Sequence, residues 1–188
     1  ATCLQKLAAS SHVPVIGVIK PGARAAVNAT RNHRVGIIGT ERTIKSRAYE
    51  RAISALNGQI SVFSRACPLF VPLVEEGWLE NEAAFFTAKT YLEPLKQQGI
   101  DTLVLACTHY PLLKPVIGQV MGKGVQLVDS AKETAKEVWR ILKEENLLRK
   151  ENTPANYQYF VSDNPEKFVR VGEGFLKKPI DLIKVIDF

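Results

Sequence analysis

Short apolar runs alternate with segments of helical spacing along this 188-residue sequence, and this alternation constrains the fold most strongly. The runs are rich in Val, Ile and Leu with little polar alternation, which is typical of strands buried on both faces of a parallel sheet. We expect strands at 13–19, 35–40, 60–67, 102–107, 125–130 and 157–162. We expect helices at 43–56, 82–96 and 131–148, where one face of each segment is apolar. The pattern predicts an α/β fold with right-handed crossovers.

Two interruptions of this alternation of strands and helices predict a division into domains. Pro21-Gly22 near the beginning predicts a turn, and we expect Asn-Thr-Pro at 152–154 to end the last long helix. A further strand and a helix that begins at Asp163 or Asn164 follow. We therefore expect a continuous α/β unit at 22–130, with residues 1–21 and 131–188 belonging together in a second α/β unit.

Composition excludes several classes of protein. With 46% hydrophobic and 23% charged residues, the chain is neither a disordered tail nor a fibrous protein. No apolar run reaches the roughly 18 residues of a membrane helix. The three cysteines are widely spaced and predict no disulfide framework, which favours a reducing compartment. We expect a globular cytoplasmic protein that does not bind membranes.

The net charge of +6 is concentrated near the beginning of the chain. Residues 1–60 carry nine Lys or Arg and two Glu, whereas the remainder carries 16 basic and 17 acidic residues. Such an excess can form a surface for phosphates or nucleic acid. No aromatic residues interleave the basic ones, as a base-stacking surface requires. We therefore expect solvated helix faces, or a counterpart to an acidic segment, and no nucleic-acid partner.

The most informative cluster of reactive residues follows one predicted strand. Functional groups of an open α/β sheet gather at the carboxyl ends of its strands. Cys107 ends an apolar run, and Thr108 and His109 precede Pro111, where a helix can begin. A helix N-terminus favours the thiolate, and a histidine two residues away can exchange a proton with it. The alternative is a buried structural cysteine with a capping threonine and a hydrogen-bonded histidine.

Other strand ends carry weaker candidates. Cys67 has no adjacent titratable partner, which favours a core cysteine. The carboxylates of Glu75 and Glu76 could face a cleft or lie in a solvated loop. Thr40 and Thr43 flank a predicted helix start, so their expected role is N-capping. The three histidines are too scattered to suggest a metal site.

The segment LACTHYPLL at 105–113 closely resembles the second catalytic motif of glutamate racemases. The similarity continues through VPVIGVIKPGARAAV (13–27), VGIIGTERTIKSRAY (35–49) and ACPLFVPLVEEG (66–77), in the order of the family. The cysteine motif alone would match the wider superfamily of amino-acid racemases. The segment CPLFVPLVE and the THY after the cysteine favour the glutamate branch.

This resemblance implies a fold and an activity. The family has two similar doubly wound α/β domains with mainly parallel sheets and a substrate site between them. It interconverts L- and D-glutamate by 1,1-proton transfer without a cofactor or metal, which supplies D-glutamate for peptidoglycan synthesis. Two thiols on opposite faces of the substrate act as acid and base. Family members are often dimers, so a homodimer is compatible with the resemblance.

The resemblance also assigns roles to individual residues. Cys107 matches the base for one enantiomer, His109 matches the histidine that assists it, and Glu75 matches a carboxylate near the same site. The residues implied to contact the substrate are Thr108, Thr40 and Thr43.

One part of the family pattern has no match. The first catalytic cysteine of the family lies in an A-C-N-T motif and is paired with an earlier aspartate, whereas this chain begins ATCLQKL. Cys3 is not followed by Asn-Thr, so we do not assign it that role. We expect the first domain to be incomplete in this chain, and the chain alone to have little activity. The alternatives are a racemase for aspartate or another amino acid, or an inactive fragment that acts as a binding module.

Overall fold

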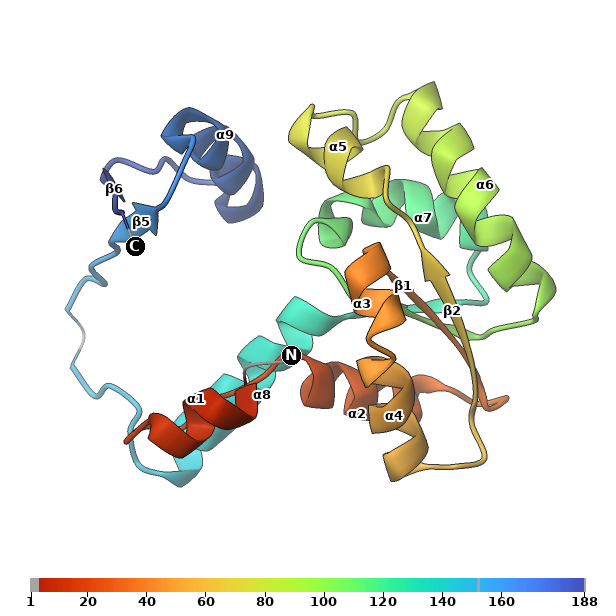
Figure 1. Cartoon of the computed structure of the whole chain (residues 1–188), viewed down its shortest axis with the longest axis horizontal. Coiled ribbons are helices and arrows are strands. Elements are labelled where there is room, and N and C mark those ends of the chain that lie inside the picture. Colours follow the sequence, from red (N-terminus) through yellow and green to blue (C-terminus); the bar gives the residue numbers. More distant parts are fainter. Residues whose placement is uncertain (1–3, 152, 188) are drawn as a thin grey trace.

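A parallel four-stranded sheet forms the centre of the computed structural model, which describes residues 4–151 and 153–187 (Figure 1). Its order is β2-β1-β3-β4, and neighbouring strands are parallel. The bounds are Arg34–Gly39 for β1, Ser61–Ala66 for β2, Thr102–Leu105 for β3 and Gln126–Asp129 for β4. The predicted parallel α/β sheet is thereby confirmed. The edge strand β2 is only half-buried, whereas β3 is buried throughout.

Helices cover both faces of the sheet. The helices α2 (Ile19–Ala29) and α4 (Ala48–Leu56) bury one face, on which Ile37 and Val104 lie. The opposite face carries Ile38 and Leu103 and packs against α5 (Phe70–Glu75), α6 (Glu82–Gln97) and α7 (Lys114–Met121). Successive residues of each strand thus enter different cores, as the two-residue repeat of a strand requires.

The prediction of a strand at 13–19 is wrong. The segment before Val18 forms no strand, and α2 begins at Ile19. Pro21 lies in the first turn of this helix, where no intrahelical N–H is needed. Gly22 is buried, and a Cβ atom there would lie 2.9 Å from Oγ of Ser130. Pro21-Gly22 therefore forms part of a tightly packed helix instead of a turn.

The helix expected at 43–56 is divided into two. The short helix α3 covers Glu41–Lys45, and α4 begins at Ala48. Arg47 between them has a φ of 50°, so the chain leaves the helical path for one residue. The other two predicted helices are present as α6 and α8 (Ser130–Glu144). Asn152, where a helix break was predicted, lies outside the described residues.

The last part of the described chain forms a smaller strand-helix-strand unit. The strands β5 (Tyr159–Val161) and β6 (Ile183–Val185) are parallel, and α9 (Pro165–Leu176) connects them. Asn164 caps α9 as predicted, because its side chain accepts a hydrogen bond from the Lys167 N–H. Residues 153–158 lead into β5 without forming a helix or a strand, and α9 approaches α5 (Figure 1).

The remaining N-terminal helix, α1, covers Leu4–Ser10. Within the described parts of the chain, no helix combines the length and the apolar character needed to cross a membrane. The division into units at 22–130 and at 1–21 with 131–188 stays a prediction.

Candidate active site

The central sheet brings the predicted residues to one edge. Ile38 of β1 lies opposite Leu105 of β3, and the Ala106 N–H donates to the Ile38 carbonyl at 2.8 Å. Thr40 and Cys107 therefore leave neighbouring strands at the same edge. The order β2-β1-β3 accounts for this arrangement, because carboxyl ends of adjacent parallel strands point the same way.

The turn that carries Cys107 is held by a buried tyrosine. After β3, the chain enters a short 3-10 helix, η1 (Tyr110–Leu113), which continues into α7. The Tyr110 hydroxyl donates to the Cys67 carbonyl at 2.8 Å, and its ring packs edge-on against Phe70. The side chain of Tyr110 is completely buried. Residues 107–109 therefore leave the sheet from a firmly anchored position.

His109 and Glu75 face each other beside this turn. Nε2 of His109 lies 3.5 Å from Oε1 of Glu75, and the two side chains are 25% and 27% exposed. Nδ1 of His109 lies 3.3 Å from the Thr108 hydroxyl. Glu75 is the last residue of α5, and Gly77, with a φ of 74°, follows that helix. Glu75 is thus held at a helix end and does not lie in a solvated loop.

Thr40 and Thr43 start the helix after β1. The Thr40 hydroxyl accepts a hydrogen bond from the Thr43 N–H at 3.4 Å, and the two hydroxyls lie 3.0 Å apart. The predicted N-cap is therefore confirmed for Thr40, whereas Thr43 lies inside α3 and supplies the N–H group that is capped. Gly39 allows this close approach, since a Cβ atom there would lie 3.1 Å from the Thr43 methyl group. Contact of either threonine, or of Thr108, with a substrate stays a prediction.

The helix α9 contributes residues that the sequence did not suggest. Nζ of Lys167 lies 2.7 Å from Oε2 of Glu75, and Arg170 donates to the Glu75 carbonyl oxygen at 3.2 Å. The ring of Phe175 stands edge-on to His109 at 6.3 Å. These residues lie far from Glu75 in sequence, and no local motif marks them. Only the predicted helix start near Asn164 was available as a signal.

Burial dominates the acidity of the two described thiols. It raises the pKa of Cys107, although N–H groups of the following residues and the Thr108 hydroxyl partly offset this effect. The expected preference for the thiolate is therefore wrong for this structure. Burial raises the pKa of Cys67 to about 12, and Cys67 is fully buried. The prediction that Cys67 is a core cysteine is confirmed.

The Glu75 carboxylate is stabilised in its charged form. Lys167 is the main cause of its lowered pKa, and His109 acts in the same direction, whereas burial opposes both. A carboxylate, an imidazole and a thiol are thus grouped at the carboxyl edge of the sheet. Such a group can accept and donate protons at a bound carbon acid.

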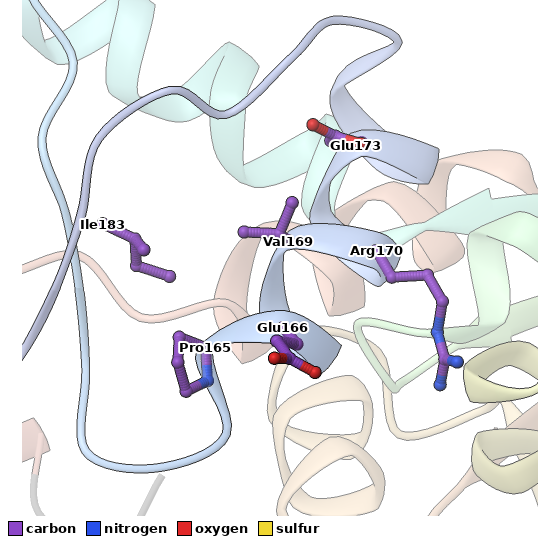
Figure 2. A pocket seen from close by; sticks show the side chains of 6 residues that line it. All are labelled: Pro165, Glu166, Val169, Arg170, Glu173 and Ile183. Carbon is purple, nitrogen blue, oxygen red and sulfur yellow. The ribbon is translucent and has the colours of Figure 1, made fainter.

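A hollow near this site is formed by α9 and β6. Its volume is about 500 Å³, and its lining residues are Pro165, Glu166, Val169, Arg170, Glu173 and Ile183 (Figure 2). The Arg170 side chain points away from Ile183 and Val169 in this view. None of the predicted site residues lines this hollow. The cluster of Cys107, His109 and Glu75 is therefore identified by its side chains and not by this hollow.

Comparison with known sequences identifies relatives. Residues 1–138 match the family model described as Asp/Glu/Hydantoin racemase. A glutamate racemase from Geobacter metallireducens is 56% identical over 176 residues, which are 94% of this chain and 65% of that protein. A glutamate racemase from Neisseria meningitidis serogroup A is 50% identical over 177 residues, with the same shares covered. The chain thus spans about 65% of the length of these two relatives.

Solved structures agree with this relationship. A glutamate racemase isoform from Bacillus anthracis superimposes with a TM-score of 0.91 and 37% identity, covering 98% of this chain and 68% of that chain. The Francisella tularensis glutamate racemase, solved in complex with D-glutamate, gives a TM-score of 0.87 and 34% identity, with 96% and 66% covered. The chain therefore belongs to the Asp/Glu/hydantoin racemase family and is similar to glutamate racemases over nearly its whole length.

Proposed function

We propose that this chain carries one half of the acid–base pair of a glutamate racemase, with Cys107 as the group that exchanges the Cα proton. One observation carries the proposal. Cys107 is a half-buried thiol two residues after the end of β3, in the same turn as His109, whose Nε2 lies 3.5 Å from Oε1 of Glu75. It also lies in a chain that is 56% identical to a glutamate racemase.

The proposed reaction needs no net change in oxidation state. The Cys107 thiolate takes the Cα proton, and the electron pair of the broken C–H bond is delocalised into the substrate carboxylate. A thiol on the opposite face then donates its proton to the same carbon and becomes the thiolate. Because both groups are thiols, the roles exchange when the reaction runs in the other direction. No cofactor is required for this exchange.

The raised pKa of Cys107 suits this task. The Cα–H bond of an amino acid is very weakly acidic, so a weakly basic thiolate would remove its proton slowly. A thiolate formed in a site with little water is a stronger base. His109 can receive or return the thiol proton, and Glu75 orients the imidazole. Thr108, Thr40 and Thr43 would supply donors for the substrate carboxylate or acceptors for its ammonium group.

The second thiol is proposed to be the cysteine of the A-C-N-T motif in the family pattern, which these 188 residues do not match. We therefore propose that the chain alone has little racemase activity. The product D-glutamate would serve peptidoglycan synthesis in the cytoplasm. A homodimer would be compatible with the family.

The test compares the 188-residue chain with the same chain preceded by the N-terminal segment of the Geobacter metallireducens relative. Circular dichroism follows conversion of each glutamate enantiomer, and proton NMR in heavy water follows exchange at Cα. We expect activity in the fusion only. Cys107→Ser should abolish it, whereas Cys67→Ala, which alters a core cysteine, should retain it.

Two results would contradict the proposal. If Cα exchange in the fusion survives Cys107→Ser for both enantiomers, Cys107 is not the base. If the unfused chain converts glutamate as fast as the fusion, the reaction does not depend on a second thiol from the added segment. Aspartate is assayed beside glutamate, and faster conversion of aspartate would favour the alternative substrate.

A further inference from the structure

Lys167 and His109 approach the Glu75 carboxylate from different sides. Nζ of Lys167 lies 2.7 Å from Oε2, whereas Nε2 of His109 lies 3.5 Å from Oε1. Each oxygen therefore faces one partner. The Lys167 side chain is 40% exposed, so the ion pair adds little to the stability of the fold. Its consequence is the orientation of the carboxylate.

We propose that Lys167 is a positioning residue: it holds the Glu75 carboxylate so that Oε1 faces His109 and keeps the imidazole proton on Nε2. This inference rests on the function proposed above, because it assigns a use to the His109 tautomer in that reaction. A carboxylate beside one ring nitrogen of a histidine favours the proton on that nitrogen and fixes the ring orientation.

The tautomer decides what the other ring nitrogen can do. With the proton on Nε2, Nδ1 carries a free lone pair and accepts hydrogen bonds. Nδ1 lies 3.3 Å from the Thr108 hydroxyl, on the side of the ring away from Glu75. An Nδ1 atom with a free lone pair can therefore receive the proton of the Cys107 thiol, as the proposed function requires. With the proton on Nδ1, that nitrogen could only donate.

A neighbouring contact separates positioning of the carboxylate from simple docking of α9. Arg170 lies one turn after Lys167 and donates to the backbone carbonyl of Glu75 at 3.2 Å, not to its carboxylate. Removal of either residue takes one positive charge and one contact with α5 from the same helix. Only removal of Lys167 releases the carboxylate oxygen.

The test uses the 188-residue chain with ¹⁵N-labelled histidine. Imidazole nitrogen shifts report which nitrogen carries the proton, at a pH where titration of the same signals shows a neutral ring. His109→Gln assigns the signals. Lys167→Met removes the charge but retains the packing of the aliphatic stem, Lys167→Arg keeps a donor, and Arg170→Gln is the matched control.

We expect the parent chain, Lys167→Arg and Arg170→Gln to show the proton mainly on Nε2. Lys167→Met should raise the Nδ1-protonated share several-fold, and Lys167→Gln should do the same if the methionine variant does not fold. An unchanged tautomer in the folded Lys167 variants would overturn the proposal. An equal change in Arg170→Gln would also overturn it, because docking of α9 would then be the cause.

The outcome is separable from that of the proposed function. The nitrogen shifts are measured on a chain that needs no racemase activity. If the fusion is a racemase but the His109 tautomer does not depend on Lys167, only this inference is refuted. A tautomer that depends on Lys167 would stand even if glutamate were not the substrate.

Discussion

Asp101 offers a sharp test of how the sheet is held together at the end opposite Cys107. It precedes β3, and its Oδ1 accepts hydrogen bonds from the hydroxyls of Thr30 at 2.7 Å and Thr102 at 3.0 Å. Its Oδ2 accepts from the backbone N–H groups of Arg31 at 2.6 Å and Asn32 at 2.8 Å. One carboxylate thus joins the end of α2 to the start of β3.

The change Asp101→Asn keeps the size of the side chain but removes half of its acceptors. The amide oxygen can still accept from the two hydroxyls, whereas the NH₂ group faces two N–H donors. A hydrogen bond to a charged group contributes about 1.5–3 kcal/mol. Since Arg31 and Asn32 are exposed, water replaces part of what they lose. We expect the free energy of unfolding to fall by about 2–3 kcal/mol at neutral pH.

The same contacts predict how this difference depends on pH. Burial opposes ionisation of Asp101, but the hydrogen bonds from Thr30, Arg31 and Asn32 outweigh it and lower the pKa. The unfolded chain therefore binds the proton at higher pH, near the ordinary value of about 3.9. The stabilisation is complete above that value and is lost as the pH falls through the lower pKa of the folded state. Parent and variant should therefore converge in acid.

Urea denaturation followed by far-UV circular dichroism measures both effects. Thr30→Val is the control, because it removes one of the four donors and should cost about 1 kcal/mol. The reasoning fails if Asp101→Asn differs from the parent by less than about 0.5 kcal/mol at neutral pH. It also fails if the difference remains undiminished at about pH 3, where the carboxylate of the unfolded chain is mostly protonated.

Three further experiments test the packing and the thiols. Tyr110→Phe removes a 2.8 Å hydrogen bond to the Cys67 carbonyl and should lower the free energy of unfolding by about 1 kcal/mol, measured in urea. Tyr91→Phe, which loses a 3.4 Å contact, should cost less, and equal costs would contradict this. Alkylation by iodoacetamide, mapped by mass spectrometry, should be faster at Cys107 than at the buried Cys67, and faster labelling of Cys67 would contradict this. The rate at both thiols should rise with pH, because burial raises both pKa values. Gly36→Ala should destabilise the fold by about 1–3 kcal/mol, because its Cβ would meet buried side chains, and an unchanged urea midpoint would refute this.

Local patterns in the sequence suffice for most of the central sheet. Runs of Val, Ile and Leu predict β1 to β4 to within two residues at each end, because a strand buried on both faces needs apolar side chains on both. The same criterion fails at 13–19. An apolar run of that length does not distinguish a strand from a segment that leads into a buried helix. There the packing of Gly22 against Ser130 decides the outcome.

In the candidate site, too, the sequence predicts some features and only the tertiary packing decides the others. Cys107, Thr108 and His109 are neighbours in sequence, so their motif and their place after a strand can be read directly. Their contacts cannot, because these depend on the strand order, on the end of α5 and on the approach of α9. The sequence thus determines which reactive groups the chain carries. Long-range packing alone decides that Lys167 and His109 share one carboxylate, and that burial raises the pKa of Cys107 where a helix start suggested the opposite.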